Sequence, residues 1–441
     1  MLKDIVYYEI DEAFKIHHVK GREIIDSRGK PTVEAEVSTV GGGVGVAAVP
    51  AGASKGKHEA WELRDGDLRF FGLGVRKAVT NIDTIISKEI VGLDSRYQRE
   101  VDNRMILLDG TPNKSKLGAN AILAVSIATS KAAADTYGLP LFRYWGGYLA
   151  RTLPTPFLNI INGGKHAGNE LSIQEFMIVP GGADSFSEAV RMACEVYYKL
   201  REFLKEKYGF QAVNVGDEGG FAPPMSRSRD ALDALVRAIK MAGYVEGSDI
   251  AIAIDAAASS FYDEEKMKYF IDGKHVNPDG LLEYYVELVE EYPIISIEDP
   301  FYEEDFRRFA ELTKNIGSKV LIVGDDLFVT NINRFREGVM QGSANAILVK
   351  MNQIGTVSET FDVIHYAKQV NYQPIISHRS GETEDTTIAD LAVATNAGAI
   401  KTGAPARGER TAKYNRLLRI EEILGSEAKY AGFTIFPSKP K

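Results

Sequence analysis

Several apolar segments in the second half of the chain are each followed by a charged or titratable residue. The series contains three acids, two lysines and a histidine: Asp255, Glu298, Asp325, Lys350, His378 and Lys401. Carboxylates that lie close together bind divalent cations through hard oxygen ligands, and lysines beside them balance charge or exchange protons. These residue types indicate a metal-dependent enzyme that acts on a small phosphorylated or carboxylated anion, with proton abstraction by a lysine.

The apolar segments predict how these side chains are positioned. Runs such as 251–254 (AIAI) and 346–349 (AILV) are short and continuous, as in strands that are buried on both faces. Most of the intervals between the runs match the length of one strand plus one helix. Such units predict a parallel sheet or an α/β barrel, whose chemistry lies at the C-terminal ends of the strands. We therefore expect the charged residues to converge on one mouth.

The three acids are the candidate metal ligands. Asp255, Glu298 and Asp325 offer only oxygen atoms, which suits Mg²⁺ or Mn²⁺ and not a structural zinc ion. Any one of them could instead cap the helix that follows its strand. Three acids at successive strand ends favour the metal interpretation.

The two lysines are the candidates for proton transfer. A second cation and a metal ion would push Lys350 or Lys401 towards the neutral form, which can act as a base. A salt bridge to the neighbouring carboxylates is the alternative for either lysine taken singly.

Loops elsewhere carry further polar candidates. Residues 216–220 (GDEGG) place Glu218 in a glycine-flanked turn that can present it to a cleft, although a plain acidic turn would look similar. Residues 162–168 (NGGKHAG) carry His166, for which a structural role is the alternative, and the pair Gln174 and Glu175 follows.

Two segments have the features of phosphate-binding loops. Residues 50–56 (PAGASKG) could hold a phosphate through backbone N–H groups, but they lack the spacing of a Walker motif. Residues 377–382 place Arg379 and Ser380 beside His378, and an arginine with a hydroxyl group binds phosphate well. An internal ion pair of Arg379 is the alternative.

Composition limits the classes of partner. The net charge of −9 argues against nucleic acid, and no apolar run reaches the ~18 residues of a membrane-spanning helix. One cysteine excludes an internal disulfide and is compatible with a reducing compartment. The N-terminus lacks the basic and apolar order of a signal peptide, so we expect a cytoplasmic protein.

Turn and periodicity signals divide the chain into parts. Residues 31–50 alternate between apolar and polar and contain glycine-rich turns, which predicts a hairpin, and residues 118–137 predict a helix. We expect an N-terminal extension of unknown role at 1–17, an α+β capping domain at 18–148 and an α/β barrel at 149–441.

Many of these motifs together resemble the enolases, the phosphopyruvate hydratases of glycolysis. The resemblance covers nearly the whole chain, and its matching strings are DSRGKPTVE (26–34), GASKGKHEA (52–60), NGGKHAG (162–168), QEFM (174–177), GDEGG (216–220), SIEDP (296–300), GDDL (324–327), KMNQIGT (350–356), SHRSGETED (377–385) and KTGAPARGER (401–410). It implies a smaller N-terminal α+β domain and a C-terminal (β/α)8-type barrel whose first units are irregular, with the order β-β-α-α.

The resemblance also implies the reaction, a Mg²⁺-dependent, reversible dehydration of 2-phospho-D-glycerate to phosphoenolpyruvate, with two Mg²⁺ ions in each active site. Asp255, Glu298 and Asp325 match the ligands of the first ion, and Ser54 matches a ligand of the second. Lys350 matches the base and Glu218 the acid. The remaining matches are substrate contacts, of which His166 and Glu175 lie closest to the chemistry: His166, Gln174, Glu175, His378, Arg379, Ser380 and Lys401.

Two other functions are weaker interpretations. A related lyase or racemase that acts on another carboxylate would normally lack the GASKG and SHRSGETED strings, and a catalytically silent scaffold would have lost Lys350, Glu218 or a metal carboxylate. The family resemblance suggests a homodimer or an assembly of dimers. An additional cell-surface role through the C-terminal PSKPK is an alternative to a simple solvated chain end.

Overall fold

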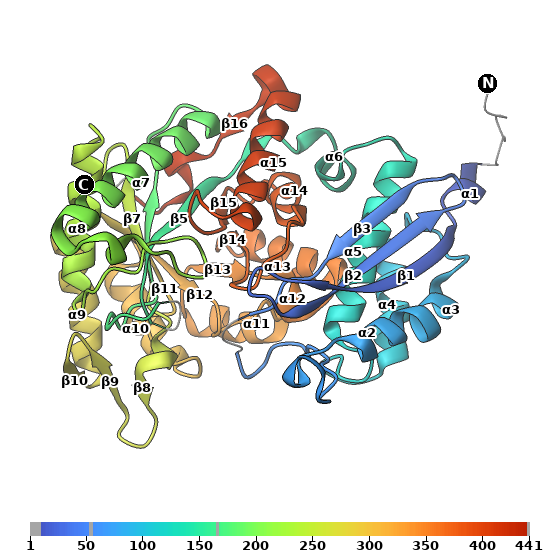
Figure 1. Cartoon of the computed structure of the whole chain (residues 1–441), viewed down its shortest axis with the longest axis horizontal. Helices are drawn as coiled ribbons and strands as arrows, with labels where there is room; N and C mark the ends of the chain where they lie inside the picture. Colours follow the sequence, from blue (N-terminus) through green and yellow to red (C-terminus); the bar gives the residue numbers. More distant parts are fainter. Residues whose placement is uncertain (1–9, 53–55, 165–166, 439–441) are drawn as a thin grey trace.

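The structure is a computed structural model that describes residues 10–52, 56–164 and 167–438. It has two parts, a three-stranded sheet with helices and a barrel surrounded by helices, which lie side by side in Figure 1. Both predicted classes of structure are therefore confirmed.

The N-terminal part is built on an antiparallel sheet. Its strands lie in the order β1 (Ile16–Ile25), β2 (Pro31–Thr39) and β3 (Val44–Ala48), which confirms the predicted hairpin. Alternate residues of β2 are buried because one face of the sheet packs on α5 (Ala119–Thr136), the helix that the sequence predicted. The other helices of this part are α1 (Ile10–Ala13), α2 (Arg76–Asn81), α3 (Ser87–Ile90), α4 (Gln98–Asp109) and α6 (Leu141–Gly146).

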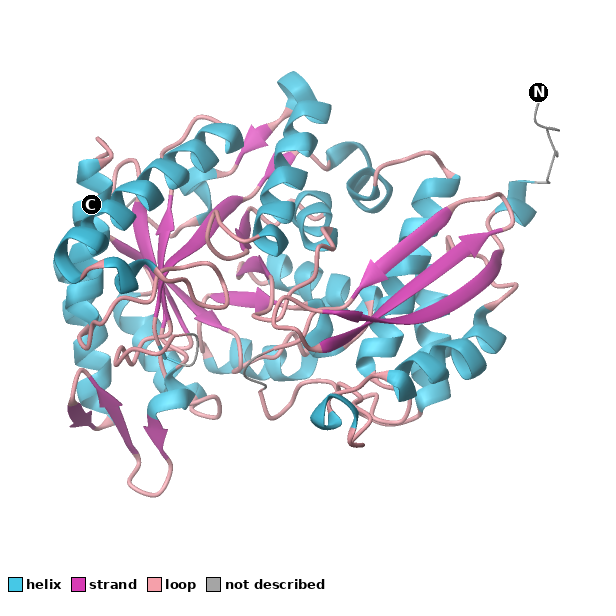
Figure 2. Ribbon diagram, viewed as in Figure 1, coloured by secondary structure: helices cyan, strands magenta, loops and turns pink. Residues whose placement is uncertain are grey.

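The C-terminal part is a closed barrel, which Figure 2 shows as a ring of strands inside a layer of helices. Among the described residues its strands are, in order around the ring, β5 (Thr155–Asn162), β6 (Glu175–Val179), β7 (Ala251–Asp255), β11 (Ile294–Glu298), β12 (Leu321–Gly324), β13 (Ala346–Val349), β14 (Gln373–Ser377) and β15 (Ala399–Lys401). Strand β6 is antiparallel to both neighbours, and the other pairs are parallel.

The first units of the barrel are irregular, as predicted. Strands β5 and β6 form a hairpin, and two helices follow before the next barrel strand. The helices that cover the barrel are α7 (Phe186–Tyr208), α8 (Ser228–Met241), α9 (Pro278–Glu291), α10 (Phe306–Ile316), α11 (Ile332–Gln341), α13 (Val357–Gln369), α14 (Thr387–Ala394) and α15 (Gly408–Leu424). Short elements lie between them: α12 (Met351–Ile354) and the small hairpins β8 (Tyr262–Asp263), β9 (Lys268–Ile271) and β10 (Lys274–Val276), with β4 (Thr152–Leu153) paired to β16 (Lys429–Tyr430).

The barrel interior is filled at its N-terminal end and polar at the other. Phe157, Met177 and Ile295 belong to a small buried cluster that Phe436 of the C-terminal segment also joins. The rings of Phe157 and Phe436 lie 5.8 Å apart between centroids. Because this end is filled with apolar side chains, open space for a ligand is left at the C-terminal ends of the strands.

The N-terminal part reaches the mouth of the barrel through the segment after β3. Ala51 and Gly381 exchange backbone hydrogen bonds of 2.8 and 2.9 Å, and Asn352 donates to the carbonyl of Pro50 over 3.2 Å. Lys131 of α5 also pairs with Asp385, which follows β14. Segments that are hundreds of residues apart in the sequence therefore share one edge of the mouth.

The predicted division of the chain at residues 18 and 149 remains a prediction. Strand β1 begins at Ile16, and residues 1–9 of the proposed extension lie outside the described residues. In the part of the chain that the structure describes, no helix has the length and apolar character needed to cross a membrane.

The contact between β3 and α5 gives a test of the N-terminal packing. A Cβ atom at Gly45 would lie 2.0 Å from the carbonyl oxygen of Ala128, which is helix backbone and cannot turn aside. We expect Gly45→Ala to lower the unfolding free energy by about 1–3 kcal/mol through overpacking, measured by thermal unfolding. Val44→Ala changes a half-exposed neighbour and is the control. Equal melting temperatures for the two variants would contradict the close approach.

Candidate active site

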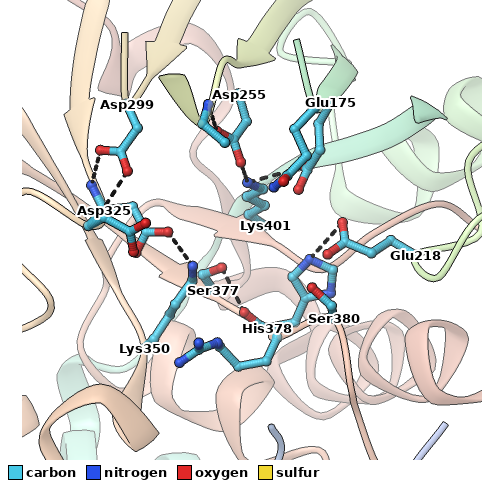
Figure 3. A pocket seen from close by; sticks show the side chains of 14 residues that line it. Glu175, Glu218, Asp255, Asp299, Asp325, Lys350, Ser377, His378, Ser380 and Lys401 are labelled. Atoms are coloured by element: carbon cyan, nitrogen blue, oxygen red, sulfur yellow. Dashed lines mark hydrogen bonds and ion pairs between the residues drawn. The ribbon is translucent and has the colours of Figure 1, made fainter. Parts of the chain in front are cut away.

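Side chains from most of the barrel strands surround a polar cavity at the C-terminal ends of those strands (Figure 3). Among the described residues, six acids and three cationic side chains line it, together with Gln174, Ser377, His378 and Ser380. All the residues predicted for the site that the structure describes are present here, either in the lining or, for Glu298, in contact with it through Lys401. Ser54 and His166 lie outside the described residues.

The three predicted metal carboxylates stand on adjacent strands. Asp255 ends β7 and is the register partner of Glu298, which ends β11, while Asp325 directly follows β12. All three side chains are buried. Their helix-capping alternative does not hold, because α9, α10 and α11 begin at other residues whose side chains accept a backbone N–H: Asn277, Asp305 and Asn331.

Lys401 lies among the carboxylates. Its Nζ is 2.9 Å from Asp255 Oδ2, 2.9 Å from both carboxylate oxygens of Glu298 and 3.2 Å from Glu175 Oε2. Burial by itself lowers the pKa of this ammonium, but attraction to Asp255, Glu175 and Glu298 outweighs burial and raises the pKa well above its usual value. Lys401 is therefore a fixed positive charge at the centre of the site.

Lys350 follows β13 and forms an ion pair with Asp325. Burial lowers the pKa of Lys350, as do Arg379 and Lys401, but attraction to the Asp325 and Glu298 carboxylates opposes them and the pKa is raised overall. Lys350 is charged in this arrangement because its direct partner is the buried carboxylate of Asp325. The neutral lysine expected from the sequence belongs to a site that also contains a metal ion, and it stays a prediction.

Asp299 is a residue of this site that the sequence prediction missed. Its carboxylate accepts the backbone N–H groups of Asp325 and Asp326, both over 2.8 Å, and so fixes the turn that presents Asp325. Burial raises the pKa of Asp326 to about 8, with a further contribution from Asp325. Asp299, Asp325 and Asp326 offer oxygens within 4.8 Å of one another. The adjacent acids in SIEDP and GDDL were the available signal.

Glu175 and Glu218 occupy another side of the cavity. Burial raises the pKa of Glu175 well above the usual value, and the nearby Glu218 carboxylate raises it further. Asn159 donates to Glu218 Oε2 over 3.1 Å, and His378 Nε2 lies 3.4 Å from the same oxygen. Burial lowers the pKa of His378 to about 4, so this ring is neutral over most of the range in which the protein would work.

Arg379 is held by a residue of the N-terminal part. Its Nη1 and Nη2 each lie 3.1 Å from one oxygen of the Glu59 carboxylate, and Nη1 also donates to Asn352 over 3.1 Å. Paired bonds of this kind fix the plane of a guanidinium. The ion pair that the sequence left as an alternative for Arg379 therefore exists, and the arginine also lines the cavity. Glu59 was not predicted, although it lies in the string GASKGKHEA.

Comparison with known proteins decides the family. The profile of the enolase N-terminal domain matches residues 16–145, and that of the enolase C-terminal TIM barrel domain matches residues 150–438. The enolase of Methanocaldococcus jannaschii is 60% identical over 423 residues, which cover 96% of this chain and 98% of that protein. The enolases of Thermococcus kodakarensis and Pyrococcus furiosus are 59% and 58% identical over the same lengths. The chain belongs to the enolase family.

Enolases depend on Mg²⁺, and the residues of this site fit that ion. The cavity lining has an excess of buried carboxylates over cations, and its candidate ligands present oxygen and no sulfur. A buried surplus of negative charge is costly unless a cation balances it, and Mg²⁺ prefers carboxylate oxygens. The donor set therefore suits Mg²⁺ on physical grounds as well as by family membership.

The charge balance around Lys401 gives a second prediction. Lys401→Met leaves Asp255, Glu298 and Glu175 buried without their shared cation, so we expect the metal-free protein to lose about 3–5 kcal/mol of stability. Addition of Mg²⁺ should restore more of the melting temperature in this variant than in the original chain. Lys131→Met, which removes an ion pair with Asp385 outside the cavity lining, is the control. An unchanged melting temperature in chelator would contradict this account.

Proposed function

We propose that this chain catalyses the reversible dehydration of 2-phospho-D-glycerate to phosphoenolpyruvate, the enolase reaction of glycolysis and gluconeogenesis. The main support for the proposal is that a lysine, Lys350, and an acid, Glu218, line the same cavity from different sides. In Figure 3 Lys350 and Glu218 enter the cavity from different sides, and Lys401 lies between them. A dehydration needs such a pair, because one group removes a proton and another protonates the departing hydroxide.

Lys350 is proposed as the base that takes the proton from C2 of the substrate. When bound, Mg²⁺ would neutralise the carboxylates Asp255, Glu298 and Asp325 and stabilise negative charge on the substrate carboxylate. With the attraction of Asp325 and Glu298 reduced in this way, burial and the nearby cations Arg379 and Lys401 would lower the pKa of Lys350 and favour its neutral form. A lysine or histidine base that works with Mg²⁺ is the known pattern of the enolase superfamily, and the position of Lys350 agrees with that pattern.

Lys401 and Glu218 are proposed to complete the reaction. Removal of the C2 proton places a second negative charge on the substrate carboxylate, and the fixed charge of Lys401 stabilises it in a buried site. The C3–O bond then breaks, and Glu218 gives its proton to the hydroxide, so that water leaves. Glu175 lies next to Glu218, and like-charge repulsion between them favours a protonated carboxyl group in this pair.

Arg379 and Ser380 are proposed to bind the substrate phosphate, with Gln174 and His378 as further substrate contacts. Arg379 and Ser380 are buried just after β14, and Glu59 already orients the guanidinium of Arg379. We also propose Ser54 as a ligand of a second Mg²⁺ ion and His166 as a substrate contact, which rests on family resemblance. A homodimer or an assembly of dimers, and a cytoplasmic location with or without surface exposure, are proposed on the same basis.

Phosphate recognition is tested by Arg379→Ala. Loss of a charge-assisted hydrogen bond should weaken substrate binding by ~1.5–3 kcal/mol, a rise of about 10- to 150-fold in the KM for 2-phosphoglycerate. Arg99→Ala removes an exposed arginine that pairs with Asp362 and is the control. An unchanged KM for 2-phosphoglycerate, or equal activity on glycerate without phosphate, would contradict phosphate binding by Arg379.

The two catalytic roles are tested by hydrogen exchange at C2 in deuterated water. Glu218→Gln should still form the enolate, so its 2-phosphoglycerate should slowly gain deuterium with little product. Lys350→Ala should give neither exchange nor product, because the acid acts only on an intermediate that the base has made. NMR of the substrate follows both variants with Mg²⁺ present. Exchange that persists in Lys350→Ala but is lost in Glu218→Gln would reverse the two roles.

A further inference from the structure

Arg410 is a fully buried arginine that does not line the cavity. It lies in the first turn of α15 and directs its guanidinium towards two segments of the active site. Nη1 donates to His378 Nδ1 and to the carbonyl of Arg379, both over 2.6 Å. Nη2 donates to the carbonyl of Ser380 over 2.6 Å and to that of Asp217 over 3.1 Å. A buried charge with these partners connects the end of β14 to the turn that carries Glu218.

The contact with His378 determines where the imidazole carries its hydrogen. A guanidinium is always protonated in proteins and can only donate, so His378 Nδ1 must accept with its lone pair. A neutral imidazole that accepts at Nδ1 carries its hydrogen at Nε2. The opposite tautomer would place two N–H groups against each other inside a buried site.

The selected tautomer carries its hydrogen on the ring nitrogen that lies nearer to Glu218 Oε2. His378 Nε2 lies 3.4 Å from Glu218 Oε2, and Asn159 Nδ2 donates to that same oxygen over 3.1 Å. The bond from Asn159 makes Oε2 an accepting oxygen, and His378 Nε2 lies close to that oxygen at a distance longer than a normal hydrogen bond. A hydrogen on Oε2 would meet the N–H groups of both residues. The proton of the acid form is therefore favoured on Oε1.

We propose that Arg410 is a positioning residue for the dehydration: it selects the Nε2–H tautomer of His378, which with Asn159 directs the acidic proton of Glu218 to Oε1. This inference rests on the proposed role of Glu218 as the acid. Arg410 acts through His378 and does not itself meet the substrate in this arrangement.

A neighbouring lysine on α15 provides a control, because it supports the loop after β14 without contacting His378. Lys413 lies one turn further along α15, is equally buried, and binds Glu382 over 2.8 Å and the carbonyl of Thr383 over 2.6 Å. It therefore holds the segment after Arg379 through partners other than the imidazole. Lys413→Met is the matched control, since it weakens the same loop and leaves the tautomer of His378 unchanged.

The first test needs no substitution in Arg410. In the full-length protein labelled with ¹⁵N-histidine, the signals of His378 are assigned by their loss in His378→Gln, among the seven histidines of the chain. We expect Nδ1 to resonate as an unprotonated imidazole nitrogen and Nε2 as a protonated one. A hydrogen found on Nδ1, or a doubly protonated ring at neutral pH, would overturn the proposal whether or not the variants fold.

The second test compares two rates in the same sample with Mg²⁺ and 2-phosphoglycerate. In Arg410→Met and Arg410→Lys, the ratio of C2 hydrogen exchange to phosphoenolpyruvate formation should rise by about tenfold or more, since only the acid-dependent step is impaired. Lys413→Met should leave the ratio unchanged even if its melting temperature falls. An unchanged ratio in both folded arginine variants would overturn the positioning role. Absence of product from the original chain would instead reject the proposed reaction, while the tautomer remains measurable.

Discussion

The repulsion between buried carboxylates is the constraint on which this active site depends. Acids from adjacent barrel strands lie together at the mouth, where low solvent access makes like charges costly. Lys401 contacts three of them, and Lys350 pairs with Asp325. A divalent cation would balance the remaining negative charge, which is why this group of carboxylates fits the Mg²⁺ dependence of the family.

A second requirement is that two distant parts of the chain meet correctly. The N-terminal part supplies Glu59, which fixes Arg379, and backbone groups of 50–51 that bond to Asn352 and Gly381. Within the barrel, Arg410 connects α15 to the segment that follows β14. The barrel thus presents the side chains of the cavity, while contacts from outside the strands orient some of them, such as Arg379.

The barrel could be predicted from the sequence because the alternation of strands and helices is visible in local stretches of the chain. Strand ends such as Asp255 and Glu298 could be placed at one mouth once parallel strands were expected, since chain direction fixes the common end. Glu59 and Arg410 could not be found in this way. Their roles depend on partners hundreds or tens of residues away, Arg379 and His378, and on the angle at which α15 and the N-terminal loop approach the barrel.

The charge of Lys350 was also beyond sequence reasoning. The residue type of Lys350 and its position after a strand indicated a base. Its pKa, however, depends on its direct contact with the Asp325 carboxylate, which the sequence does not show. Asp299 is similar, because an acid that accepts backbone N–H groups cannot be told from a metal ligand by spacing alone. The sequence thus predicted which side chains line the cavity better than it predicted the residues that hold them in place.

The most direct test of the metal-dependent dehydration is phosphoenolpyruvate formation by the purified chain, followed by its ultraviolet absorbance. The protein is first stripped with chelator and then titrated with Mg²⁺ in the presence of 2-phosphoglycerate. We expect no product without metal and full recovery as the ion is restored, because only a cation relieves the carboxylate cluster around Asp255, Glu298 and Asp325. Turnover that persists after complete removal of divalent ions, or no product at saturating Mg²⁺, would contradict the account.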